Sequence, residues 1–363
     1  MATTTPNYLW SVPTSSDLVK NGATAIETLG DSVDASLWSS GYGQAGKNKI
    51  INGDFGVWQR GTTFSSPASS SYLADRFYLT YNGSGATRSI TQQTFTPGTA
   101  PVAGYEGSYF LRYARTVAGT AATADRISQR IEDVRTFAGQ TMTVSFWAKV
   151  DSGTSVLTVQ ASQNFGSGGS GDVGVSSTVT LTTTWTRYSV SLAIPSISGK
   201  TIGTNSAVDV QLRTLVNTIQ TFDFWGVQAE YGSSATPFQT ASGGSLQAEL
   251  AMCQRYYYRQ SQTVANAPFG SGMNASATGA RIYVKYAQPL RVNPTAIEFS
   301  TLQISDFATY GTDISGVTLS SGETGVDGGI LTITGGSGFT TNQPSFLRGK
   351  TANTSYIAFS AEL

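Results

Sequence analysis

The chain has 363 residues, of which 39% are hydrophobic and only 12% are charged, and its formal net charge is zero. This length suffices for two or three domains, and the composition is that of a folded protein and not of a disordered one. Because neither charge sign is in excess, the composition gives no sign of binding to nucleic acid or to an anionic membrane. The composition is compatible with binding of neutral polar partners such as sugars.

Histidine is absent, which removes the most common general base together with Ser/His pairs, Cys/His pairs and ordinary zinc sites. Cys253 is the only cysteine, which excludes intrachain disulfides and thiolate metal clusters, and we interpret it as a small buried hydrophobe. The N-terminus lacks the segments of a conventional signal peptide, and no apolar run is long enough to cross a bilayer. We therefore expect neither conventional export nor membrane insertion.

Residues 1–46 are predicted to form an attachment and trimerisation helix followed by a linker. Ser15 and Ser16 are candidate N-caps, and small or apolar residues follow at alternating spacings of three and four: Val19, Gly22, Ile26, Leu29 and Val33. Such a seam is typical of parallel helical bundles, although it is short and contains a glycine. A lone amphipathic helix packed on its own chain is the alternative.

Residues 47–242 are predicted to form a jelly-roll β-sandwich. We interpret the stretch 48–61, which contains the β-branched pair Ile50 and Ile51, as its opening strand and 222–230 as its closing strand. Glycine-rich turns separate roughly eight to ten candidate strands, which suits two packed sheets. We expect strands at 72–81, 108–115, 126–134, 141–150, 155–162, 179–182, 186–194, 207–215 and 221–229.

The strand 141–150 has the clearest alternation, with Val144 and Phe146 on an apolar face and Trp147 on a polar one. The apolar face is expected in the core. Trp147 is then either a platform for a ligand or a cover over a second layer.

Residues 243–363 are predicted to form a second, smaller β-sandwich after a short helical turn that starts at Leu246. The three consecutive tyrosines 256–258 must alternate between the two faces of a strand. At least one of them therefore lies outside the core that contains the others. Further strands are expected at 280–287, 296–300, 316–320, 329–335 and 355–361. The predicted fold class is therefore all-β with a short N-terminal α-helix.

Four parts of the chain resemble minor tail proteins and tail-fibre or receptor-binding proteins of tailed bacteriophages. They are the leader 5–30, the run 50–62 with 74–77, the strands 144–149 and 223–230 with 236–238, and the segment 253–257 with 356–363. The second and third are similar to strands of a carbohydrate-binding-module-like jelly roll. The resemblance implies a homotrimeric virion protein of the phage tail, made in the host cytoplasm and attached to other tail proteins by its N-terminus, with a receptor-binding tip in 243–363.

Proteins hold a sugar by stacking it on aromatic rings and by hydrogen bonds to the ring edge. Trp58 and Trp225 lie in the opening and closing strands and are expected in the core. The candidates for glycan binding are Trp147, Trp185, Tyr78, Tyr81, Tyr258, Arg281, Tyr283 and Lys285. The last three share the polar face of one terminal strand, which is our preferred surface there.

The resemblance also implies a structural calcium ion between the first and last strands of the jelly roll. Asn52, Asp54 and Asp223 would supply its oxygen ligands here. The alternative is that Asn52 and Asp54 form a turn and that Asp223 caps a strand end, without a metal ion. No other cofactor is expected.

The sequence thus favours a non-enzymatic virion protein that adheres to host cell-surface glycan. A purely structural tail or baseplate decoration without a ligand is the alternative. A glycan depolymerase is less favoured, because no local motif selects a pair of carboxylates. Nor does the chain show a repeat of roughly 20 to 50 residues, which a long β-helix would require.

Overall fold

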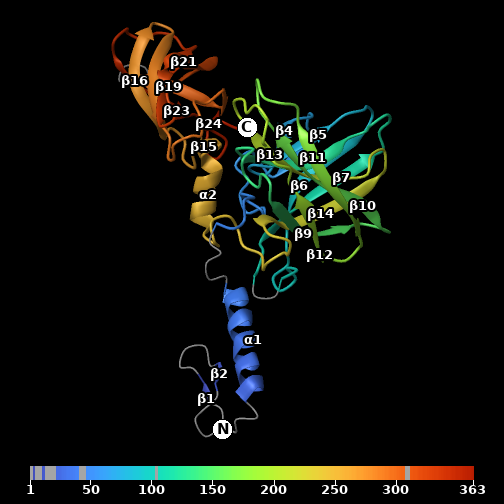
Figure 1. Ribbon diagram of the computed structural model, residues 1–363. Helices are drawn as coiled ribbons and strands as arrows, with labels where there is room; N and C mark the ends of the chain where they lie inside the picture. Colours follow the sequence, from blue (N-terminus) through green and yellow to red (C-terminus); the bar gives the residue numbers. More distant parts are fainter. Residues whose placement is uncertain (1–2, 5–9, 13–21, 41–45, 103–104, 307–310) are drawn as a thin grey trace.

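The computed structural model describes residues 3–4, 10–12, 22–40, 46–102, 105–306 and 311–363. Within this part of the chain, all regular elements except the helices α1 (Gly22–Ser40) and α2 (Leu246–Gln254) are β-strands, so the predicted all-β class is confirmed. Figure 1 shows α1 extending away from the β-rich parts, whereas α2 lies between the jelly-roll strands and the C-terminal strands.

The N-terminal helix is confirmed only from Gly22 onward. The expected caps Ser15 and Ser16 and the seam residue Val19 lie outside the described residues. Ile26 is 66% exposed, whereas Leu29 and Val33 are half-buried. Two short strands, β1 (Thr3–Thr4) and β2 (Ser11–Val12), pair antiparallel ahead of the helix in the chain. Trimerisation through this seam stays a prediction. No described helix is both long and apolar enough to cross a bilayer.

Two six-stranded antiparallel sheets pack face to face in the jelly roll. Sheet I has the order β12-β9-β14-β7-β6-β3, and sheet II has the order β11-β10-β13-β8-β5-β4. Apolar side chains from the facing surfaces form one continuous core between them. The strands are β3 (Thr63–Ser65), β4 (Ser71–Tyr72), β5 (Tyr78–Tyr81), β6 (Thr87–Thr94), β7 (Tyr109–Val117), β8 (Asp125–Glu132), β9 (Thr141–Val150), β10 (Ser155–Asn164), β11 (Val173–Leu181), β12 (Thr186–Ala193), β13 (Ala207–Arg213) and β14 (Gln220–Tyr231).

Most of the expected strands form, with changed ends. β9 has the predicted bounds, whereas the expected strand 72–81 divides into β4 and β5. The sequence missed β6, because Thr87–Thr94 is almost entirely polar and Ile90 is its only apolar residue. β6 is a strand because it pairs with β7 along the whole length of β6, although its sequence has no apolar pattern.

The stretch 48–61 is not a strand, so this prediction was wrong. Asn52 and Phe55 have positive φ angles of 61° and 55°, which end any extended conformation. The Asn52 amide donates to the carbonyls of Val57 and Asp75, and its Oδ1 accepts from the backbone N–H of Val57. These bonds hold a compact turn that seats the fully buried Phe55 in the core.

Helix α2 is tied to this turn by a buried carboxylate. Ser245 caps the helix by accepting from the N–H of Ala248. Glu249 accepts from the N–H of Asn52 at 2.5 Å and from the N–H of Ser242 at 2.9 Å. The helix start and the opening turn of the jelly roll are therefore fixed to each other, although about 200 residues separate them in sequence.

The C-terminal strands form a three-stranded sheet, β15-β24-β18, and a seven-stranded sheet, β20-β19-β23-β16-β17-β22-β21. A separate apolar core lies among them. The sequence missed β16, β19, β20 and β23. The strands are β15 (Tyr257–Ser261), β16 (Pro268–Ser276), β17 (Gly279–Lys285), β18 (Ala296–Ser300), β19 (Leu302–Asp306), β20 (Thr312–Asp313), β21 (Gly316–Thr324), β22 (Gly328–Thr334), β23 (Pro344–Gly349) and β24 (Tyr356–Ser360).

The three tyrosines 256–258 do point to different environments, as their succession predicted. Arg76 of the jelly roll lies 3.4 Å over the ring of Tyr256, and Arg60 lies 3.5 Å over the ring of Tyr257. Both guanidinium groups also pair with the buried carboxylate of Glu362. Tyr258 instead stacks on Phe359 in the C-terminal core. Two of the three rings therefore join the C-terminal strands to the jelly roll of the same chain.

We predict that Gly53→Ala destabilises the protein. A β-carbon on Gly53 would lie 2.1 Å from the carbonyl oxygen of Val227, in the closing strand that the turn contacts. The backbone must shift to relieve this overlap. We expect this shift to lower the free energy of unfolding, measured in denaturant titrations, by about 1–3 kcal/mol. Gly56→Ala is the matched control, because its β-carbon would meet nothing closer than 3.5 Å. Equal stability of the two variants would contradict the tight contact between turn and strand.

Candidate functional site

An aromatic cluster covers part of the outward face of sheet I. Trp147 on β9 lies directly opposite Trp225 on β14, with ring centroids 5.3 Å apart. Phe95, Phe110 and Phe238 complete a second apolar core around them. Trp147 is only 7% exposed, so it covers a second layer and lacks the open ring face that stacking on a sugar requires.

Three further tryptophans, Trp185, Trp225 and Trp58, are also packed. Trp185 is half-buried against Phe95 and Phe110, with ring centroids 5.5 Å and 5.3 Å away. Trp225 is fully buried, as expected, and Trp58 packs against the main core while its indole N–H donates to the carbonyl of Phe55. The outward face of sheet I therefore has its aromatic side chains covered by other parts of the same chain.

The three expected calcium ligands do not form a common oxygen cage. Asn52 uses its amide within the opening turn. Both carboxylate oxygens of Asp223 accept from Arg112, at 2.7 Å and 2.9 Å, and Lys149 lies 3.6 Å away. No group of three or more acidic, Cys or His side chains suited to a metal occurs in the described part of the chain. The residues as placed do not fit a shared calcium ion.

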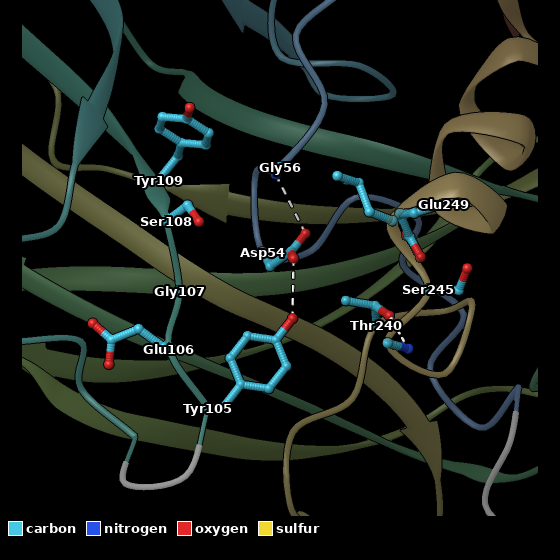
Figure 2. Close-up of a pocket in the computed structure, with 12 residues that line it drawn as sticks. Asp54, Gly56, Tyr105, Glu106, Gly107, Ser108, Tyr109, Thr240, Ser245 and Glu249 are labelled. Carbon is cyan, nitrogen blue, oxygen red and sulfur yellow. Dashed lines mark hydrogen bonds between the residues drawn. The ribbon is translucent and has the colours of Figure 1, made fainter. Parts of the chain in front are cut away.

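A cavity of about 380 Å³ lies between the opening turn, the segment 105–109 and the start of α2. Figure 2 shows the Tyr105 hydroxyl donating to Asp54, at 3.1 Å. Burial raises the pKa of Asp54 above its ordinary value. Glu249 is engaged by two backbone N–H groups, and the Glu106 carboxylate points away from Asp54 in Figure 2. The carboxylates of Asp54 and Glu249, which both line this cavity, are therefore engaged by donors of the same chain.

A second pocket, of about 340 Å³, lies on the outward face of sheet II, and we call it the sheet II groove. The strands alternate here, so that Val208, Val210 and Leu212 of β13 point into the core. Asp209, Gln211 and Arg213 consequently point outward. The strand register places Asp209 opposite Arg130 of β8 and Gln211 opposite Gln160 of β10. A polar floor therefore spans neighbouring strands.

Asp209 is the buried centre of this floor. It is only 6% exposed, and its Oδ2 accepts from the Tyr78 hydroxyl and from the Gln211 amide, both at 2.8 Å. Its Oδ1 has no hydrogen-bond partner. Burial raises the pKa of Asp209, and the bond from Tyr78 and the charge of Arg130 oppose this rise. A buried carboxylate oxygen without a donor indicates a place for a hydroxyl or a water.

Aromatic rings border the floor at the β4 and β5 edge. The rings of Tyr72 and Tyr78 are 5.6 Å apart, and the Arg130 guanidinium lies 5.1 Å from the Tyr78 ring centroid. The Tyr72 hydroxyl and Arg130 Nη1 both donate to the backbone oxygen of Leu363, at 3.0 Å and 2.6 Å. Burial raises the pKa of Tyr72 to about 12, so this hydroxyl stays a donor at neutral pH. The groove thus combines apolar rings with directed polar groups.

Of the sequence-predicted glycan residues, only Tyr78 lines the sheet II groove. The Tyr81 ring is covered by Arg88 at 3.8 Å, and its hydroxyl donates to the Pro67 carbonyl. Tyr258 is buried in the C-terminal core. Asp209 and Gln211 were not among the residues predicted from the sequence, although their alternation with Val208 and Val210 indicates a polar strand face.

The terminal candidates keep the predicted face. Arg281, Tyr283 and Lys285 point to solvent from β17, while Ala280, Ile282 and Val284 are buried. Arg281 pairs with Glu323 and donates to the Ser320 hydroxyl. Glycan binding by this face stays a prediction.

Comparison with known family models finds one match within the jelly roll. A family model described as a carbohydrate binding domain matches residues 95–211, which include Arg126, Arg130 and Asp209 of the groove. No curated protein matches the chain.

Several solved structures are similar to part of the chain. The first, described as "CBM4 structure and function", has 18% identity and a TM-score of 0.32, and covers 50% of this chain and 99% of its own. The enzymatically active domain of tailspike protein 4 from bacteriophage CBA120 has 16% identity and a TM-score of 0.34, covering 51% and 22%. A family 11 carbohydrate-binding module from Clostridium thermocellum has 12% identity and a TM-score of 0.30, covering 47% and 96%.

We predict that Trp147→Ala destabilises the folded protein. Removing this ring leaves a cavity beside Trp225 and should lower the free energy of unfolding by about 3–5 kcal/mol, measured by chemical denaturation. Tyr283→Ala, at a side chain that is 49% exposed, is the control and should change it by about 0.5 kcal/mol or less. A Trp147→Ala protein of normal stability that had lost affinity for glycans would restore the ligand-platform interpretation.

Proposed function

We propose that this protein is a tail-fibre or minor tail protein of a bacteriophage that adheres to host cell-surface glycan through the sheet II groove. The matched carbohydrate binding domain supports the ligand class. The sequence resemblance of the leader, the jelly-roll strands and the chain end supports the virion role. The observation that carries the proposal is the polar floor around Asp209, because it lies in an open pocket and holds an unsatisfied buried oxygen.

The chemistry of this floor suits a saccharide. The Oδ1 of Asp209 accepts a hydrogen bond from a sugar hydroxyl, and the amides of Gln160 and Gln211 both donate and accept. The half-buried ring of Tyr72 supplies apolar surface at the edge of the groove, and the buried Tyr78 holds Asp209 in place. Hydrogen bonds to a charged group contribute about 1.5–3 kcal/mol each, so a bond to Asp209 contributes more than a bond to one of the neutral amides.

Avidity gives the proposed arrangement its strength. A shallow sugar site binds on the order of millimolar, and linking three copies raises the effective affinity by about 100-fold or more. The helix α1, with its exposed Ile26, is the proposed trimerisation and attachment element. Sedimentation of the full chain as a monomer would contradict this part of the proposal.

The proposed activity is binding without catalysis. Asp209 is held by Tyr78 and Gln211 and faces Arg130 on the next strand. The other aspartate that lines the groove, Asp172, accepts from the amide of Asn164. Glycoside hydrolysis generally needs a second carboxyl group about 5 to 10 Å away across the scissile bond. Release of reducing ends from a bound polysaccharide would overturn this part of the proposal.

We predict that Asp209→Asn weakens glycan binding by about tenfold or more. The full chain is first applied to a glycan array, and the affinity for the strongest ligand is then measured by calorimetry for the wild type and the variant. The amide keeps the shape of the side chain but loses the charged acceptor, and tenfold corresponds to about 1.4 kcal/mol.

Asp133→Asn is the matched control, since the side chain of Asp133 is about half exposed, pairs with Arg135 and does not line the groove. It should bind like the wild type, and thermal unfolding should show both variants folded. Unchanged affinity of Asp209→Asn would exclude the groove as the site. A chain that bound no glycan at all would favour the purely structural tail component.

A further inference from the structure

Two arginines face each other at one end of the sheet II groove. Arg126 of β8 lies directly opposite Arg213 of β13, and Thr80 and Thr158 flank them in the same row of side chains. Arg126 lines the pocket. Arg213 donates to Gln160 at 2.7 Å and more weakly to Gln211. Among the residues that the structure describes, no carboxylate lies within ion-pair distance of either guanidinium.

This pair is electrostatically unfavourable in the unliganded protein. Like charges directly opposite on one sheet face destabilise the pairing of the strands. The Nε of Arg126 is buried and has no hydrogen-bond partner. Burial and the neighbouring charge of Arg126 also lower the pKa of Arg213. An anion placed between the two guanidinium groups would remove the repulsion and supply the missing acceptor.

Asp209 interacts with Arg126 only through charge, because the hydrogen bonds that Asp209 accepts come from Tyr78 and Gln211. Arg130 and Asp209 form an opposed pair of unlike charge, and Arg213 lies four residues along β13 from Asp209, with Gln211 between them. Because alternate residues of a strand are about 7 Å apart, the two ends are separated by about 13 Å. The groove therefore has one end that holds Arg130 with the carboxylates of Asp209 and Asp172, and a cationic end at Arg126 and Arg213. The neutral amides of Gln211 and Gln160 connect the two ends.

We infer that the ligand of this groove is an acidic saccharide, whose carboxylate or phosphate group binds between Arg126 and Arg213 while its neutral rings lie along Gln211 toward Asp209. Guanidinium groups bind both kinds of anion with paired, directed hydrogen bonds. The separation of the two ends accommodates an oligosaccharide, so the charged and neutral contacts act on one ligand. This inference rests on the proposed glycan-binding function and specifies its substrate class.

The test compares acidic oligosaccharides with their neutral counterparts on the full chain. The probes are uronate oligosaccharides beside their methyl esters, and phosphorylated oligosaccharides beside their dephosphorylated forms, on one array with calorimetry of the strongest ligand. The wild type should bind an acidic probe at least tenfold more tightly than its neutral form, and added salt should weaken this binding. Comparison of the uronate pair with the phosphorylated pair shows whether the recognised group is a carboxylate or a phosphate.

The variant Arg126→Gln/Arg213→Gln should lose this preference and bind both forms of the probe equally. Arg126→Lys/Arg213→Lys keeps the charge and should retain most of the preference, which separates an electrostatic role from a defect in folding. Arg135→Gln, at an exposed arginine outside the groove, is the control and should behave like the wild type.

The outcomes separate the inference from the function on which it rests. Binding of neutral oligosaccharides that depends on Asp209 but not on the two arginines would overturn the acidic ligand and leave the glycan-binding groove intact. Failure to bind any saccharide, acidic or neutral, would overturn both.

Discussion

The register between β8 and β13 is the constraint on which the sheet II groove depends. Val208, Val210 and Leu212 are buried in the main core, and this burial fixes which face of β13 points inward. Because side chains alternate along a strand, a slip of one residue would exchange the core and the groove floor. The same apolar residues that stabilise the sandwich therefore position Asp209 against Arg130 and Arg213 against Arg126.

The two outward faces of the jelly roll have opposite characters. Sheet I carries Trp147 and Trp225, but the chain covers them with its own Phe95 and Phe238, so that face adds a second small core. Sheet II stays open and polar, and the rings of Tyr72 and Tyr78 lie at its edge. Aromatic content alone does not identify a binding face, since a large ring stabilises a core as readily as it binds a sugar.

Local pattern predicted the elements better than it predicted the site. The alternation in β9 gave its bounds and the outward direction of Trp147, but the cover over that ring comes from residues that are distant in sequence. Likewise, Tyr78 donates to Asp209 across 131 positions, a contact that only the strand order creates. The opening turn escaped prediction because its fold depends on positive φ angles at Asn52 and Phe55, and on bonds to Asp75 and Glu249. No periodicity encodes such side-chain to backbone bonds.

The central claim is that a glycan binds across β13 and β8. The most direct measurement is a crystal structure of the full chain with the oligosaccharide that binds it most tightly. We expect a sugar hydroxyl within hydrogen-bond distance of Asp209 Oδ1, with the saccharide lying over Gln211. A saccharide bound instead on the β17 face beside Tyr283, or in the cavity beside Asp54, would contradict the account.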